Sequence, residues 1–144
     1  MFPGMHVAFA LFADAANVSQ EGKLNILGVF DALHVGASPA VHPRAHLVVH
    51  LKGTSMDIGN HTVTLRWLNP HGTELWSSAG DLNVGPLPTG VVEMDVPLIA
   101  QIDLPIDGAG PYAMAIALDD EPRAEVPVQV RVGAPMTTPS RLVS

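Results

Sequence analysis

Apolar and polar residues alternate with a period of two along much of this chain. In residues 91–105, every even position from 92 to 104 is apolar, and the odd positions between them are mostly polar. This alternation predicts a β-strand that buries one face. Pro97 indicates that this strand lies at a sheet edge or contains a bulge. Shorter runs with the same period occur at residues 5–13, 61–69, 112–118 and 125–132.

Turn residues separate these runs. Residues 69–72 read NPHG, which fits a type I turn, and the acidic segment 118–126 joins the last two predicted strands. We count seven to nine short strands and no convincing amphipathic helix. The predicted fold class is therefore all-β, an antiparallel β-sandwich that is immunoglobulin-like or related.

Residues 43–53, PRAHLVVHLKG, fit two structures. Proline near the start and glycine at the end are typical of a helix, whereas Ala45, Leu47, Val49 and Leu51 alternate with polar residues as in a strand. Val48 interrupts the polar face. We favour a strand because the neighbouring segments are strands.

Residues 19–31, SQEGKLNILGVFD, hold two glycines in a short space. Gly22 lies where the chain must reverse after the first strand, and Gly28 interrupts the second strand, which indicates a bulge or a close backbone approach. A phosphate-binding loop needs a helix after its glycines, and a Gly-Lys-Ser/Thr sequence is missing here. The segment therefore predicts the corner of a β-hairpin.

The segment EGKLNILGVFDAL resembles a signature of small bacterial all-β proteins known only as a domain of unknown function. The resemblance is clearest over residues 5–33. It implies the fold class and supplies no activity and no site residues. Separately, LPIDGAGPYAMAI at 104–116 resembles the tyrosine corner of immunoglobulin-like sandwiches, with Tyr112 placed in the core.

Composition excludes several functions. With 7 basic and 14 acidic side chains, the net charge of −7 argues against nucleic acid and anionic membranes as partners. The apolar opening lacks the basic residues of a signal peptide, so it is expected to belong to the fold. The chain has no cysteine, which removes thiolate chemistry and fits a cytoplasmic protein. We expect one domain at residues 1–133 and a tail at 134–144.

The seven histidines are the main candidates for chemistry. On a strand, His46 and His50 lie about 13 Å apart, too far to share a metal ion. His34, His61 or His71 could still join either of them from a neighbouring strand. We expect no metal and no cofactor. No serine lies in a nucleophile motif, and the acidic turn at 119–121 lacks the spacing of a calcium loop. We therefore expect a protein that is not an enzyme.

Two strand faces carry small uncharged residues where a solvated face normally carries charge. They fit either cover within the same domain, for example by the loops at 53–60 or 85–90, or a contact between copies of the chain. In the second case Leu142 and Val143 of the tail are additional docking residues, and Ala115→Glu is expected to disrupt the contact. The predicted function is a non-catalytic binding or assembly module that self-associates, as a homo-oligomer or in a larger assembly. The alternative is a small-molecule or metal site lined by the histidines. In the first strand, Val7, Phe9 and Leu11 are predicted to face the core. The interface candidates are Ala8, Ala10 and Phe12, on the opposite face of that strand, together with Ala113, Ala115 and Ala117.

Overall fold

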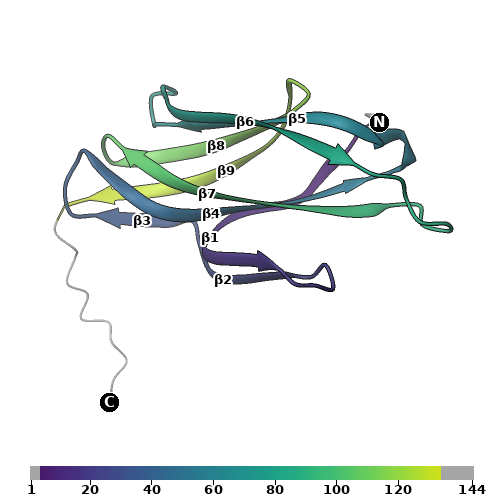
Figure 1. Ribbon diagram of the computed structural model, residues 1–144. Helices are drawn as coiled ribbons and strands as arrows, with labels where there is room; N and C mark the ends of the chain where they lie inside the picture. Colours follow the sequence, from purple (N-terminus) through teal and green to yellow (C-terminus); the bar gives the residue numbers. More distant parts are fainter. Residues whose placement is uncertain (1–3, 134–144) are drawn as a thin grey trace, which may run out of the picture.

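The computed structural model describes residues 4–133, which form a sandwich of two β-sheets (Figure 1). One short 3-10 turn, η1 (Ser55–Asp57), is the only helical element in this part of the chain. The predicted all-β sandwich is confirmed. The strands are β1 (His6–Val18), β2 (Leu24–Phe30), β3 (Ala32–Val35), β4 (Ala40–Gly53), β5 (Gly59–Leu68), β6 (Glu74–Val84), β7 (Met94–Ile106), β8 (Gly110–Leu118) and β9 (Glu121–Val132).

The strand order is β2-β1-β4-β7 in the four-stranded sheet and β3-β9-β8-β5-β6 in the five-stranded sheet. All pairs are antiparallel except β3 and β9, which are parallel. The predicted antiparallel pairing therefore holds for every strand pair except this one. The chain leaves β2 and crosses at once to the other sheet, where the four residues of β3 run beside the last strand in the same direction.

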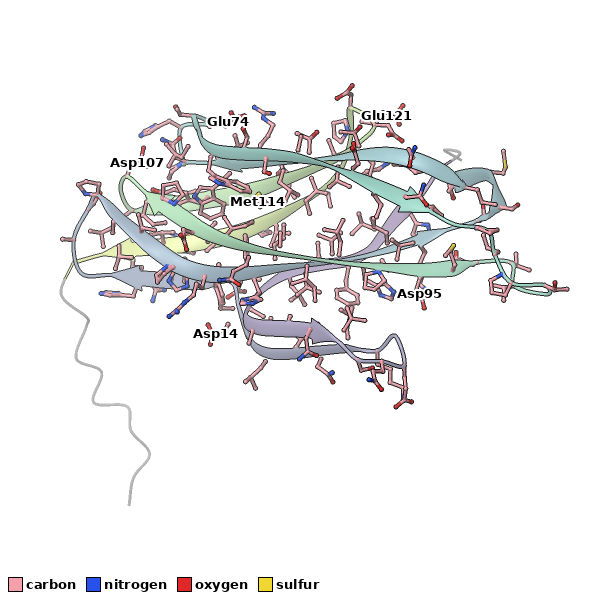
Figure 2. All side chains as sticks on the ribbon, viewed as in Figure 1. Asp14, Glu74, Asp95, Asp107, Met114 and Glu121 are labelled. Atoms are coloured by element: carbon pink, nitrogen blue, oxygen red, sulfur yellow. The ribbon has the colours of Figure 1, made fainter. Side chains whose placement is uncertain are left out.

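The core lies between the two sheets and is built from the alternating apolar positions. Tyr112, Met114, Ile116 and Leu118 of β8 are all buried, and Met114 lies between the sheets in Figure 2. Trp67 of β5 stacks on the Tyr112 ring at a centroid distance of 5.2 Å. The faces predicted for residues 61–69, 112–118 and 125–132 are therefore confirmed.

The ambiguous segment 43–53 is part of strand β4, so the preference for a strand is confirmed. Its alternation places Leu47, Val49 and Leu51 in the core. Val48 faces the opposite side of the sheet and is also fully buried, which explains why an apolar residue interrupts the polar face.

The first strand differs from its prediction. A register shift lies between Val7 and Phe9, so Ala10 and Phe12 pair with the inward-facing residues Val49 and Leu47 of β4. Phe12 is fully buried in the core, whereas Phe9 is 37% exposed. The predicted core positions Phe9 and Leu11 are therefore wrong. One extra residue at a bulge reverses the face of every later side chain.

The end of β1 and the whole of β2 form a hairpin, residues 13–30, that we call the arm. Figure 1 shows the arm set apart beneath the other strands. Leu24 and Ile26 of the arm line a groove together with Phe9 and His50, so the arm lies over the outer face of the four-stranded sheet. A tight turn at residues 19–22 closes it, as predicted for a hairpin corner.

Gly28 sits at the base of the arm with φ +73°, a conformation that favours glycine. A Cβ atom at this position would lie only 2.9 Å from Cγ of Asp14, on the paired strand β1 (Figure 2). The pairing is regular on both sides of Gly28, with Ala13 opposite Val29 and Ala15 opposite Leu27. The predicted bulge is therefore wrong, and the close neighbour of Gly28 is the Asp14 side chain rather than another stretch of backbone.

Candidate functional site

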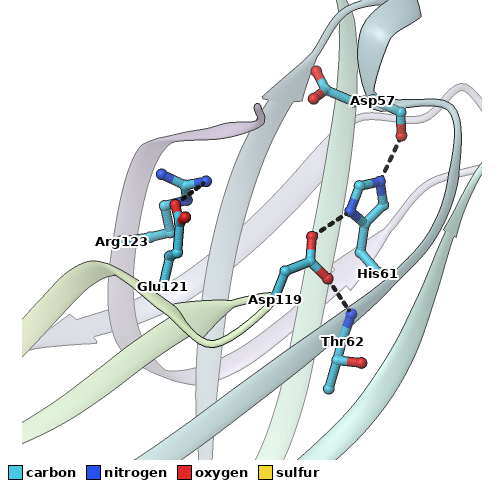
Figure 3. A network of polar contacts seen from close by, with 6 residues as sticks. All are labelled: Asp57, His61, Thr62, Asp119, Glu121 and Arg123. Carbon is cyan, nitrogen blue, oxygen red and sulfur yellow. Dashed lines mark hydrogen bonds and ion pairs between the residues drawn. The ribbon is translucent and has the colours of Figure 1, made fainter. Parts of the chain in front are cut away.

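One cluster of polar side chains lies at the end of the sandwich where β5 begins (Figure 3). His61 of β5 is its centre. Its Nδ1 lies 2.7 Å from Oδ2 of Asp119, in the turn between β8 and β9, and its Nε2 lies 2.6 Å from the backbone oxygen of Asp57. His61 therefore joins two turns that are far apart in the sequence.

Each turn is ordered by local hydrogen bonds. Thr54 caps η1: its backbone N–H donates to Oδ2 of Asp57, and its hydroxyl oxygen accepts from the Met56 N–H. Asp119 and Asp120 both have positive φ, as expected for a two-residue hairpin turn. Oδ1 of Asp119 accepts from the Thr62 N–H at 2.9 Å.

Both ring nitrogens of His61 face hydrogen-bond acceptors, so both are used as donors when the ring is protonated. The hydrogen bond to Asp119 is the main cause that raises the pKa of His61 above 6.5, and the bond to the Asp57 carbonyl adds to it. The same contact lowers the pKa of the Asp119 carboxyl, with help from the Thr62 N–H. The two groups therefore form an ion pair when His61 is protonated.

This arrangement fastens two turns together, and both ring nitrogens of His61 already contact oxygen atoms of the protein. Arg123 lies beside the cluster and pairs with Glu121 at 3.3 Å. The acidic turn itself uses the Asp119 carboxyl internally. The chemistry available to the cluster is that of a structural contact whose strength depends on pH.

The other two histidine candidates lie on the other sheet. His46 and His50 are in β4, where Nδ1 of His46 contacts the Arg44 carbonyl and Nε2 of His50 lies 3.3 Å from Asp95. His61 belongs to the five-stranded sheet. Within residues 4–133, no three histidine or acidic side chains are grouped closely enough to hold a metal ion. The structure therefore does not bring the predicted histidines together.

A second feature is the exposed edge of the four-stranded sheet at β2. Sheet edges in soluble proteins are usually protected by charge, proline or short length. Three of the four edge strands follow this rule: β3 has four residues, β6 contains Glu74 and Asp81, and β7 contains two prolines and two aspartates. Strand β2 reads LNILGVF and has none of these protections.

The side chains of β2 add to this lack of protection. Leu27 is 73% exposed and Val29 is 61% exposed on the same face of the strand. Both are large apolar residues in a strand that pairs only with β1 among the described residues. The β2 edge can therefore accept another strand, with backbone hydrogen bonds and apolar contacts.

The predicted interface residues are divided by the structure. Ala113, Ala115 and Ala117 are half-buried on the outer face of the five-stranded sheet, and Arg66 lies directly opposite Ala115. Ala8 is exposed at the bulge, whereas Ala10 packs against the core. Phe12 as an interface residue is wrong, because its side chain is fully buried inside the sandwich.

Leu27 and Val29 were not among the interface residues that the sequence indicated. A signal was present, since residues 24–30 contain no charge and no proline. The missing charges and prolines acquire a meaning only from the strand order, which places residues 24–30 at the edge of the four-stranded sheet. The predicted docking residues Leu142 and Val143, with the rest of the tail at 134–144, lie outside the described residues.

The fold and the two features described above define a two-sheet β-sandwich with a polar cluster at one end and an unprotected edge strand. The model of a family described as "Family of unknown function (DUF6941)" matches residues 8–131. The chain belongs to this family, which agrees with the resemblance found in the sequence. No curated protein matches the chain.

Among solved structures, the chain is similar to one described as Pseudomonas fluorescens alkylpurine DNA glycosylase AlkC bound to DNA containing an abasic site analog. The identity is 10% and the TM-score is 0.47, over 90% of this chain. The chain spans 31% of the length of that protein. A likeness this distant is no argument for an activity of this chain.

The exclusion of nucleic acid from the possible partners is nevertheless corrected. It was drawn from the net charge alone, and a protein bound to DNA is among the structures that this chain resembles. Net charge describes the whole chain and not one surface, so it cannot exclude a class of partner by itself.

In residues 4–133, no helix has the length and apolar character needed to cross a membrane.

Proposed function

We propose that this protein is a non-catalytic binding and assembly module that associates with copies of itself. The observation that supports this most directly is the unprotected β2 edge, which exposes Leu27 and Val29 beside unpaired backbone groups. An unprotected edge strand can pair with a strand of another molecule, so in a monomeric protein it carries a risk of aggregation. A partner strand removes that disadvantage.

The polar cluster at His61 supports a structural role for the remaining candidate chemistry. A general base needs a free ring nitrogen within reach of a substrate, and both nitrogens of His61 are already hydrogen-bonded inside the protein. The alternative site lined by histidines is less favoured, because His46 and His50 lie on one sheet and His61 on the other.

Two finer statements accompany this proposal. An immunoglobulin-like type of sandwich is supported by Tyr112, whose hydroxyl lies 3.0 Å from the backbone nitrogen of Asp107 and 2.7 Å from the carbonyl of Gly108. A cytoplasmic location is supported by the absence of cysteine from the whole chain.

Static light scattering on the full chain tests the assembly. We expect a mass above the 15.2 kDa of one chain when the protein is concentrated to the high micromolar range. A mass of one chain over the whole concentration range would refute self-association. The measurement needs no knowledge of the interface.

A further inference from the structure

We propose that two copies of this chain pair through β2, antiparallel, about a two-fold axis at Leu27. The four-stranded sheets of the two copies then form one continuous sheet across the interface. The proposal rests on the proposed function and adds the surface and the register. A two-fold axis is the simplest way in which one strand pairs with its own copy.

The alternation of side chains restricts the register. Asn25, Leu27 and Val29 of β2 are odd-numbered and exposed, so they share one face of the strand, and Lys23 and Asp31 lie just beyond its two ends. When two copies of the strand pair, an exposed side chain lies beside an exposed side chain only if odd-numbered residues lie opposite odd-numbered residues. An axis through a residue of β2 satisfies this condition.

Charge then selects Leu27 as the centre. Lys23 and Asp31 flank β2, four positions before and four positions after Leu27. With the axis at Leu27, Lys23 lies opposite Asp31 of the partner subunit, and the same pair repeats at the other end. With the axis moved to Ile26, Asp31 would lie opposite Glu21 of the partner subunit, which places like charges together.

The exposure of these groups fits such a contact. The Lys23 side chain is 78% exposed, and its only ion pair within the described chain is with Glu21, at 3.8 Å. An exposed pair at that distance contributes little to stability, so Lys23 remains able to pair with a second carboxylate. Asp31 is also exposed.

The charge of the whole chain points to the same surface. Each copy has a net charge of −7, so two copies repel each other over most of their surfaces. Strand β2 itself carries no charge, and its two flanking charges are opposite in sign. The β2 edge is therefore a surface on which two acidic copies can approach with complementary charges.

A contact between two seven-residue strands is small, so we expect a dimer that forms measurably only at high concentration. Covalent trapping is the appropriate test. The chain contains no cysteine, so Leu27→Cys introduces a single thiol that faces its own copy across the axis. Mild oxidation is expected to give a disulfide-linked dimer in high yield.

Val29→Cys is the matched control, because Val29 is exposed on the same face of the same strand. In the proposed register its thiol lies about 13 Å along the strand from the equivalent thiol, too far for a disulfide. Val92→Cys, at an 82% exposed position before β7, reports random collisions. Equal yields from all three variants would overturn the proposal.

Charge exchange tests the register independently. In the Leu27→Cys background, Lys23→Asp or Asp31→Lys places like charges opposite each other and is expected to lower the disulfide yield about fivefold. Combining the two substitutions restores opposite charges and is expected to restore the yield. A combined variant that stays as low as the single variants would refute the Lys23–Asp31 pairing.

The outcomes separate this proposal from the proposed function. If light scattering shows an oligomer but Leu27→Cys gives no more disulfide than Val92→Cys, the assembly role stands and the β2 interface is wrong. If the unmodified chain is a monomer at every concentration and no variant forms a disulfide above the level of Val92→Cys, both are wrong.

Discussion

His61 and Asp119 are 58 residues apart in the chain, yet the imidazole and the carboxylate lie 2.7 Å apart and join the start of β5 to the β8–β9 turn. The other ring nitrogen, Nε2, is hydrogen-bonded to the backbone oxygen of Asp57 at 2.6 Å. A histidine with acceptors on both nitrogens binds its second proton more tightly in the folded state than in the unfolded state.

This contact predicts a specific pH dependence of stability. The folded-state pKa of His61 lies above 6.5, so its contribution is fully present below pH 6.5 and is lost as the pH rises through that raised pKa. The folded-state pKa of Asp119 lies below 3.8, so its contribution is present above pH 3.8 and is lost as the pH falls through that lowered pKa. The contact therefore stabilises most between these limits.

We expect His61→Gln to cost about 1 kcal/mol near pH 5.5, a modest value because Asp119 is largely exposed to solvent. The difference from the unmodified protein should decrease as the pH rises through the raised pKa of His61. Urea unfolding at a series of pH values measures it, with His6→Gln as the control at an exposed position. A pH-independent difference would contradict an ion pair.

The sequence predicted the strands well wherever one face was apolar and the other polar. Residues 43–53 and 125–132 are examples, because each carries a clear contrast between its two faces. In β1, by contrast, residues 7–13 are apolar on both faces, so a change of face leaves no trace in the pattern. The bulge between Val7 and Phe9 was therefore invisible, and Phe12 was placed on the wrong side.

The candidate sites were less predictable than the fold. The partners of His61 depend on how two distant turns meet, and no local spacing in the sequence encodes that. The β2 edge depends on the strand order, in which β3 leaves β2 and joins the other sheet. The local signature of Tyr112, by contrast, was readable, because its hydroxyl contacts residues only four and five positions away.

Tyr112→Phe is expected to destabilise the fold by about 1–3 kcal/mol. The Tyr112 oxygen accepts from the backbone N–H groups of Asp107 and Gly108, at 3.0 and 3.1 Å, and phenylalanine leaves both donors without this partner. Urea denaturation gives the change in free energy of unfolding. Ala109→Ser, an exposed substitution in the same turn, serves as the control and should change stability little.

Gly28→Ala is expected to destabilise the protein more than Gly22→Ala. Both glycines have positive φ, +73° and +81°, so each substitution costs about 1 kcal/mol in backbone strain. Only Gly28 has a crowded neighbour, since its added Cβ would meet the Asp14 side chain, whereas nothing lies within 4 Å at Gly22. We expect a total cost of about 2–4 kcal/mol at Gly28.

Thermal or urea unfolding of the two variants compares these costs directly. Replacing Asp14 by glycine in the Gly28→Ala background should recover the part of the loss that comes from crowding, which a double-mutant cycle isolates. Equal losses for Gly28→Ala and Gly22→Ala would show that the Asp14 side chain moves aside at no cost.

Ala115→Glu and Leu27→Lys distinguish the two surfaces that can join copies of this chain. If the β2 edge is the interface, Leu27→Lys places two ammonium groups face to face across the axis and lowers the mass at high concentration to that of one chain. Ala115→Glu, on the outer face of the five-stranded sheet, then leaves the oligomer intact, because a glutamate there lies beside Arg66 rather than in a contact. Light scattering at matched concentrations gives both masses, and thermal unfolding confirms that each variant is folded.

The reverse result, with Ala115→Glu monomeric and Leu27→Lys unchanged, would assign the interface to the alanine face, where a buried carboxylate is strongly unfavourable.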